Sequence, residues 1–310
     1  MEMVSIVVPC FNEEDAIGIF YNEISRLLSL TDRKFEYELV FVDDGSIDKT
    51  LAIIKEYSSI DVHVHFVSFS RNFGKEAAIY AGLRKATGDY VAVMDVDMQD
   101  PPRLIPHMYD AIVNDGYDCV ATRRISRKGE PIIRSFFSKN FYWLFNKISK
   151  TQIHDGARDF RLMTRKMVDS ILSLNEVNRF SKGIFSWVGY KTKWLEYENI
   201  ERSKGNTKWS FWKLFVYSID GIIAFSTAPL VLSSIMGIVS CMVAVGIMII
   251  VIVKTLLYGD PVAGYPSLIS IITFMGGIQL LSLGILGQYL SKIYLEAKKR
   301  PLYIISTESK

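Results

Sequence analysis

Two carboxylates, separated by one residue, follow an apolar stretch in the first third of the chain. Residues 91–94 read Val-Ala-Val-Met, and Asp95 and Asp97 come directly after them. A short continuous apolar run is typical of a buried strand. Because open α/β sheets bind ligands at the carboxyl ends of their strands, both side chains are candidate ligand contacts. Two hard oxygen ligands near a phosphate would suit Mg²⁺ or Mn²⁺, whereas an isolated Asp-x-Asp would equally fit an acidic turn.

Two earlier strands are also predicted to end in polar clusters. The β-branched run at 4–8 precedes an Asn-Glu pair at 12–13, and the run at 37–42 precedes two aspartates at 43–44. Amphipathic helical patterns alternate with these runs, which favours a mainly parallel α/β sheet. Since parallel strands joined by right-handed crossovers point the same way, the clusters should converge on one cleft. Taken singly, each cluster could instead be a helix cap or a solvated first-turn charge.

Composition narrows the function classes. With 22% charged and 49% apolar residues the chain is expected to fold, and a formal charge of +3 is too small to argue for nucleic-acid binding. The three cysteines are scattered without metal-binding spacing, which fits a reducing compartment. No Gly-x-Gly-x-x-Gly follows the first strand, so a dinucleotide-binding fold is not expected.

Two uncharged segments near the C-terminus indicate a membrane hairpin. Residues 230–253 and 268–290 contain 24 and 23 residues without a charge, and about 20 suffice to cross a bilayer as a helix. The outer flanks are basic, whereas the short connection is not. These basic residues are Lys204, Lys208, Lys213, Lys292, Lys298, Lys299 and Arg300. The positive-inside rule therefore places both termini and the N-terminal domain in the cytoplasm, at the cell (inner) membrane.

Between these regions the chain becomes basic. Residues 123–150 carry eight basic residues and one acid, and 134–150 have helical periodicity with aromatics. A basic amphipathic helix of this kind fits the membrane interface, although it could also simply pack on the sheet. Residues 154–162 are predicted to be a polar loop. The basic segment 201–209 is predicted to bind phosphate at the bilayer surface or to serve only as a positive-inside anchor.

The motifs together resemble a known family. Ser-Ile-Val-Val-Pro at 5–9, Val-Asp-Asp-Gly-Ser at 42–46 and Asp-x-Asp-x-Gln-Asp-Pro-Pro at 95–102 are similar to inverting GT-A fold family 2 glycosyltransferases of the dolichol-phosphate-mannose-synthase type. With Ser-Arg-Asn-Phe-Gly-Lys-Glu-Ala at 70–77, Arg-x-x-Gly-x-Thr-Lys-Trp at 202–209 and the hairpin, the chain looks like the bacterial polyprenyl-phosphate (bactoprenol) glycosyltransferases. The resemblance covers essentially the whole chain and implies a GT-A, Rossmann-like catalytic domain with interfacial helices.

The resemblance assigns residues to four roles. The implied nucleotide- and donor-binding residues are Pro9, Phe11, Glu13, Asp43, Asp44, Arg71, Lys75, Asp95 and Gln99. The implied ligands of Mg²⁺ or Mn²⁺ are Asp95, Asp97 and Gln99. The implied catalytic residues are Asp97, Asp159 and Arg202, with Asp159 as the base near the acceptor. The implied acceptor-phosphate ligands are Arg161, Arg202 and Lys208.

The implied reaction moves one sugar from a UDP-sugar to undecaprenyl or another polyprenyl phosphate, with inversion, for cell-envelope glycan modification. Glucose is the first expectation; N-acetylglucosamine and galactose also fit the motifs. The acceptor phosphate carries about −1.5 to −2 charge at pH 7, so it hardly needs a strong base. We therefore expect Asp159 to contribute less than positioning by Arg202 and Lys208. Because Asp97 projects beyond the strand, we expect it to meet the metal, and Asp95 to orient the donor.

The expected organisation has four parts: a nucleotide-sugar-binding core at 1–133, an acceptor-side part at 134–226, the hairpin at 227–292 and a cytoplasmic basic tail at 293–310. The expected partners are the donor, the lipid acceptor and membrane lipids, and glycines in the spans would permit self-association. A processive polysaccharide synthase is an alternative, but two spans make a poor channel and Gln-x-x-Arg-Trp is absent. A catalytically inactive membrane tether is the other alternative.

Overall fold

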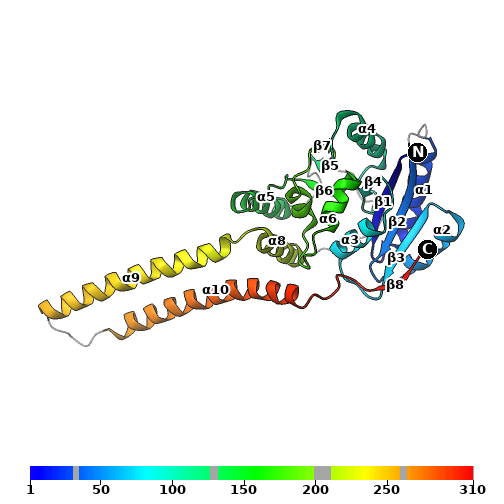
Figure 1. The fold of residues 1–310 in the computed structure, drawn as a ribbon. Helices are drawn as coiled ribbons and strands as arrows, with labels where there is room; N and C mark the ends of the chain where they lie inside the picture. The colour runs from blue at the N-terminus through cyan, green and yellow to red at the C-terminus, as the bar shows by residue number, and fades with distance from the viewer. Residues whose placement is uncertain (31–34, 126–131, 199–210, 259–263, 310) are drawn as a thin grey trace.

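The computed structural model describes residues 1–30, 35–125, 132–198, 211–258 and 264–309. Within these ranges one mixed sheet forms the centre of the catalytic region, with helices on both faces (Figure 1). Its strands are β1 (Met3–Cys10), β2 (Glu36–Asp43), β3 (Val64–Phe69), β4 (Tyr90–Val93), β5 (Cys119–Arg124), β6 (Ala157–Thr164), β7 (Thr192–Tyr197) and β8 (Ile305–Glu308). The helices are α1 (Glu14–Leu30), α2 (Thr50–Ile60), α3 (Lys75–Lys85), α4 (Ile105–Asp115), α5 (Ile132–Ile148), α6 (Arg165–Leu172), α7 (Ser181–Trp187), α8 (Phe211–Phe225), α9 (Ala228–Tyr258) and α10 (Tyr265–Ala297), with a 3₁₀ turn at Pro102–Leu104.

The sheet has the strand order β7-β5-β6-β4-β1-β2-β3-β8. The four strands β4, β1, β2 and β3 are parallel, as the alternating strand and helix pattern predicted. Strand β6 inserts antiparallel between β4 and β5, so the prediction of a polar loop at 154–162 is wrong. The sequence of β6 does carry a strand pattern, because Phe160 and Leu162 are fully buried and alternate with more polar positions.

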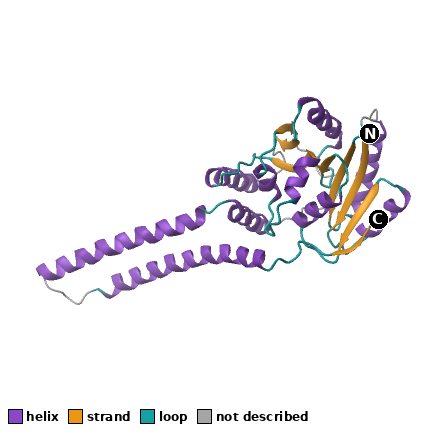
Figure 2. Ribbon diagram, in the orientation of Figure 1, coloured by secondary structure: helices purple, strands orange, loops and turns teal. Residues whose placement is uncertain are grey.

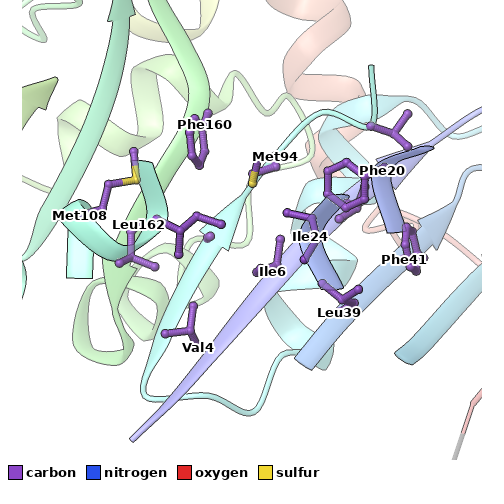
Figure 3. Packing of buried hydrophobic residues seen from close by; sticks show 14 of the residues in the cluster. Val4, Ile6, Phe20, Ile24, Leu39, Phe41, Met94, Met108, Phe160 and Leu162 are labelled. Carbon is purple, nitrogen blue, oxygen red and sulfur yellow. The ribbon is translucent and has the colours of Figure 1, made fainter. Parts of the chain in front are cut away.

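Both faces of the parallel strands are covered, which explains their continuous apolar sequences. On β1, Val4 and Ile6 belong to a cluster that includes Phe20 of α1, whereas Val7 packs into a second cluster with α3 on the opposite face. Figure 3 shows the first cluster, in which side chains from the strands meet those of the covering helices. At Gly82 of α3, an added Cβ would lie 2.1 Å from Val7 Cγ1, so only glycine permits this close helix–sheet packing.

Helices α9 and α10 leave the catalytic region side by side as a long antiparallel pair (Figures 1 and 2). Their apolar spans, Ala228–Tyr258 and Ser270–Ala297, have mean hydropathies of 2.9 and 1.7, and their most apolar windows are not buried by the protein. A helix of 31 residues extends about 46 Å at about 1.5 Å per residue, more than the roughly 30 Å hydrocarbon core. The predicted hairpin is therefore present, and its helices are long enough to reach beyond the bilayer core.

The base of α10 is tied to the catalytic region by specific contacts. Lys292 Nζ lies 2.6 Å from Asp220 Oδ1 of α8, and Tyr289 donates to the Ser226 carbonyl at 2.5 Å. Glu296 Oε1 accepts the backbone N–H of Val177 at 2.7 Å. These bonds link the apolar hairpin to α8 and to the segment between α6 and α7.

The last residues of the chain return to the sheet instead of forming a separate tail. Residues 305–308, expected to lie in a tail, form β8 antiparallel to β3. The Ser70 amide donates to the Ile304 carbonyl at 3.0 Å, and the Tyr303 ring stacks on Phe69 with centroids 4.8 Å apart. Strand β8 covers the edge of β3, which would otherwise present unpaired backbone groups.

Replacing Tyr303 by alanine should lower the free energy of unfolding of the catalytic region by about 2 kcal/mol, because it removes a half-buried aromatic side chain and its stacking. Urea unfolding of the detergent-solubilised protein would measure this loss. The matched control is Ile304→Ala: its side chain is 54% exposed, so the cost should stay within about 0.5 kcal/mol. Equal, small effects of both changes would contradict the docking of this segment.

Helix α5 matches the predicted amphipathic helix at 134–150 and packs on the protein, whereas its role at the membrane interface stays a prediction. Phe145 is fully buried, 5.9 Å from the ring of Phe180 and 6.1 Å from that of Phe225. On the outer face Trp143 is 62% exposed, with Lys147 Nζ 5.0 Å from its ring centre. The helix therefore packs on the protein and still presents an aromatic, basic face.

Candidate active site

The loops that follow the parallel strands meet at one edge of the sheet. The backbone N–H of Asn12, after β1, donates to Ser46 Oγ at 2.9 Å, and Asn12 Oδ1 accepts the N–H of Ile47 at 2.9 Å. The N–H of Glu13 donates to Thr50 Oγ1 at 2.8 Å. The predicted convergence of these polar clusters is thus present for the first two strands, and their loops hold one another in place.

The two aspartates after β2 make structural contacts. Asp43 accepts a hydrogen bond from Ser68 Oγ at 2.7 Å. Asp44 accepts the backbone N–H groups of Phe73 at 2.6 Å and Gly74 at 2.9 Å. Burial raises the pKa of Asp44, although these two N–H donors oppose the shift. Asp43 therefore ties β2 to β3 and Asp44 fixes the loop after β3, and their direct role in nucleotide binding stays a prediction.

Gly45 makes this arrangement sterically feasible. Its φ is +69°, and an added Cβ would lie 2.4 Å from the carbonyl carbon of Arg71. Any side chain here would push apart the loops after β2 and β3. The Arg71 guanidinium itself is exposed and lies 4.0 Å over the ring of Phe73.

Lys75 joins two motifs that are far apart in the sequence. Its Nζ lies 2.6 Å from Asp95 Oδ1 and 2.6 Å from Asp159 Oδ2. Burial lowers the pKa of Lys75, but attraction to Asp159 and Asp95 outweighs it and the net shift is upward. At the first turn of α3, Lys75 is therefore a fixed positive charge between the Asp-x-Asp carboxylates and the candidate base.

Asp159 is strongly ionised in this arrangement. Burial raises its pKa, but Lys75 and then Lys182 outweigh that effect, so the net shift is well below the ordinary carboxyl value. Because the folded pKa lies below the unfolded one, the resulting stabilisation is present above the ordinary value near 3.8 and is lost only as the pH falls through the lower folded value. Across neutral pH, Asp159 is an anion held by a cation.

Two polar residues without a prior assignment also belong to the site. Arg158 Nε lies 3.0 Å from Asp100 Oδ1, and Glu76 accepts hydrogen bonds from Ser181 and, at 2.9 Å, from the hydroxyl of Tyr217. Burial raises the pKa of Glu76. Arg158 could have been noticed, since it adjoins Asp159 in sequence, whereas nothing local marks Tyr217 as the partner of Glu76.

Other predicted residues have different outcomes. Pro9, Phe11 and Gln99 are half-buried along the same edge. Arg161 is only 3% exposed, and its guanidinium lies 3.8 Å over the ring of Phe185 and donates to the Arg158 carbonyl at 2.9 Å. Arg161 is therefore engaged in the core, and its role as a phosphate ligand stays a prediction. Arg202 and Lys208 lie outside the described residues.

The described residues offer oxygen ligands for a divalent ion without forming a closed protein cage. No group of three His, Cys, Asp or Glu side chains that could hold a metal ion is found in the described ranges. Asp97 is 8% exposed, and its Oδ1 accepts the backbone N–H of Gln99 at 3.1 Å. Mg²⁺-type ions commonly take one or two carboxylates and complete their shell with substrate phosphates and water. Asp97 and Gln99 fit such a shared site.

These features define an α/β protein with an acidic, cation-bridged ligand site at strand ends and an attached apolar hairpin. This is the architecture of a membrane-associated GT-A glycosyltransferase. The chain belongs to glycosyl transferase family 2, whose family pattern matches residues 5–172.

Several relatives match along nearly their whole length. A prophage bactoprenol glucosyl transferase homolog of Escherichia coli K12 is 44% identical over 99% of this chain and 99% of its own. The bactoprenol glucosyl transferase of Shigella phage SfV is 43% identical over 98% of both chains. The putative glycosyltransferase CsbB of Bacillus subtilis 168 is 42% identical over 98% of this chain and 91% of its own. Among solved structures, glucosyl-3-phosphoglycerate synthase of Mycobacterium tuberculosis aligns with a TM-score of 0.47 at 19% identity, over 72% of this chain and 78% of its own.

Proposed function

We propose that this protein transfers a single glucose from UDP-glucose to a polyprenyl phosphate, with inversion, at the cytoplasmic face of the membrane. The supporting observation is the whole-chain similarity, hairpin included, to relatives described as bactoprenol glucosyl transferases at 43–44% identity. N-acetylglucosamine and galactose are the alternative sugars. The product would be a β-linked polyprenyl-phosphate sugar used to modify cell-envelope glycans.

On the donor side, the nucleotide would lie across the loops after β1 and β2, near Phe11 and Glu13. A divalent ion, Mg²⁺ or Mn²⁺, held by Asp97 and Gln99, would offset charge on the leaving diphosphate. Lys75, which contacts Asp95 and Asp159, would exchange one of these carboxylate partners for a donor phosphate or sugar oxygen. Asp95 would then orient the donor rather than bind the metal.

On the acceptor side, Asp159 would orient the lipid phosphate and take up the last proton. Arg202 and Lys208 would hold the phosphate, and Arg161 would support them from the core through the β6 backbone. The exposed face of α5, with Trp143 and Lys147, would rest in the interfacial layer of an anionic membrane.

This proposal includes the cytoplasmic location of both termini, which the basic flanks of the hairpin favour. It also keeps the functional division into a donor-side part at 1–133, an acceptor-side part at 134–226 and a hairpin at 227–292. The two catalytic parts nevertheless share one sheet, because β6 pairs with β4.

Membranes containing the protein, incubated with radiolabelled UDP-sugars, polyprenyl phosphate and Mn²⁺ or Mg²⁺, should place label in a single lipid-linked sugar. UDP-glucose should be the best donor, and chelation of the metal should abolish transfer. Membranes without the protein and reactions without added lipid are the controls. A polymeric product would favour a processive synthase, whereas UDP-sugar binding without transfer would favour a membrane tether.

A further inference from the structure

The Asp-x-Asp motif lies in a chain of alternating charges that crosses the site. Asp95 Oδ1 contacts Lys75, and Asp95 Oδ2 lies 3.8 Å from Arg158 Nη2. Arg158 Nε lies 3.0 Å from Asp100 Oδ1, which also accepts the hydroxyl of Tyr197 at 2.5 Å. The five side chains come from α3, the loop after β4, β6 and β7, so only the folded chain brings them together.

The inner end of this chain is buried and only partly satisfied. Asp100 is 0% exposed. Within the described part of the protein, buried Asp100 Oδ2 and Arg158 Nη2 have no hydrogen-bond partner. At 3.8 Å, the contact of Nη2 with Asp95 is too long for a hydrogen bond. A buried donor without a partner is costly, so this nitrogen calls for an explanation.

The position of Lys75 supplies that explanation. In this structure Lys75 neutralises Asp95 and Asp159 together. A diphosphate donor would compete for the ammonium group and leave Asp95 without its close cation. The nearest replacement is the open Nη2 of Arg158, which a small side-chain movement would bring onto Asp95 Oδ2.

We propose that Arg158 is a positioning residue for Asp95, anchored by Asp100 and Tyr197 so that its second guanidinium nitrogen holds the Asp95 carboxylate while Lys75 engages the donor. This inference rests on the proposed function, because it requires a nucleoside-diphosphate donor. Asp100 and Tyr197 fix the guanidinium by sharing one carboxylate oxygen, and neither needs to touch the substrate. The arrangement would keep Asp95 in one orientation before and after donor binding.

A double-mutant cycle on nucleotide binding tests the proposal. The full-length, detergent-solubilised protein, its Arg158→Gln and Asp95→Asn variants and the double variant would be titrated with UDP in the presence of Mn²⁺ by calorimetry. Arg158→Gln should weaken binding about 10-fold in the wild-type background and less than about 3-fold in the Asp95→Asn background, because contacting residues are energetically coupled. Equal losses in the two backgrounds would overturn the proposal.

The matched control is Arg165→Gln. Arg165 directly follows the other end of β6, at the first position of α6, where its Nε donates to the Gly88 carbonyl at 3.0 Å. This change should lower thermal stability without changing UDP affinity in either background. A general weakening of the β6 segment would instead make Arg165→Gln and Arg158→Gln behave alike, which would also overturn the proposal.

Tyr197→Phe keeps the test decisive if Arg158→Gln does not fold. Removing one hydroxyl should weaken UDP binding about 3-fold, and this effect should vanish in the Asp95→Asn background. An unchanged affinity, or the same loss in both backgrounds, would count against the proposal. Since UDP binding needs no lipid, the cycle is independent of whether glucose reaches polyprenyl phosphate, so failure of the proposed function would be seen separately.

Discussion

Replacing Lys75 by methionine should reduce kcat/KM for the UDP-sugar donor by about 10²–10³-fold, the loss typical of removing one preorganised electrostatic group. Methionine retains most of the side-chain volume but leaves Asp95 and Asp159 facing each other without the ammonium group that now lies 2.6 Å from both. The donor diphosphate would also lose a nearby cation. We expect this to be the largest single-residue effect among the described residues.

The same variant should acquire a pH-dependent stability. Without Lys75, burial would raise the pKa of Asp159 with only Lys182 and Arg161 left to oppose it, so we expect the folded pKa to move above the ordinary carboxyl value. A group whose pKa is higher in the folded than in the unfolded state stabilises the folded state most at pH values below its unfolded pKa. This stabilisation is lost as the pH rises through the folded pKa. The melting temperature of Lys75→Met should therefore approach that of the wild type at pH 5 and fall further below it at pH 7.5.

Lys55→Met is the matched control, since Lys55 is exposed on α2; its turnover should stay within about 2-fold of wild type. Lys75→Arg should not restore activity, because a planar guanidinium cannot replace a compact ammonium between two carboxylates. Full activity of Lys75→Met would show that the ion-pair centre is not part of the donor site, whereas full activity of Lys75→Arg would show that any cation suffices there.

The parallel half of the sheet could be predicted because each strand is buried on both faces and is therefore continuously apolar. The clusters at 12–13, 43–44 and 95–97 then follow from topology, since the C-terminal ends of parallel strands share one edge. The two long C-terminal helices could be predicted for the same reason, because a helix that can cross a bilayer needs an unbroken apolar sequence. In each case one local property determines the structure.

The features that were missed depend on partners distant in sequence. Strand β6 resembles a polar loop in sequence because Arg158 and Asp159 are its second and third residues. Their burial is tolerated only because Asp100 pairs with Arg158 and Lys75 pairs with Asp159. The position of the Arg161 guanidinium over the ring of Phe185 is likewise a contact that no local pattern encodes. Strand β8 has four residues and pairs with β3 across more than 230 positions, a contact that no local pattern encodes.

The two carboxylates of the Asp-x-Asp motif should respond differently to substitution. Asp97→Asn should raise the Mn²⁺ concentration for half-maximal activity by about 30–100-fold. This is the upper part of the loss in metal affinity seen when residues that support metal ligands are replaced. Asp95→Asn should lower kcat while changing that concentration less than about 3-fold. Metal titrations of donor turnover in the wild type and both variants would measure these values.

The structural reason is the charge that already surrounds Asp95. A metal ion on Asp95 would have to displace the ammonium of Lys75 from Oδ1 and would face Arg158 near Oδ2, so two cations oppose its binding. Asp97 accepts the N–H of Gln99, a contact that fixes the orientation of the carboxylate. Asp95 is therefore the better partner for Lys75 and Arg158, and Asp97 remains the expected metal ligand.

Asp169→Asn serves as the control for loss of a carboxylate, because Asp169 is exposed on α6 and should leave both parameters unchanged. Equal shifts of the Mn²⁺ requirement in Asp95→Asn and Asp97→Asn would mean that the two carboxylates bind the metal as one unit. In that case Lys75 must leave Asp95 before the metal arrives, so Lys75→Met would lower the Mn²⁺ requirement. The direction of the Lys75→Met shift would thus show independently which carboxylate the metal uses.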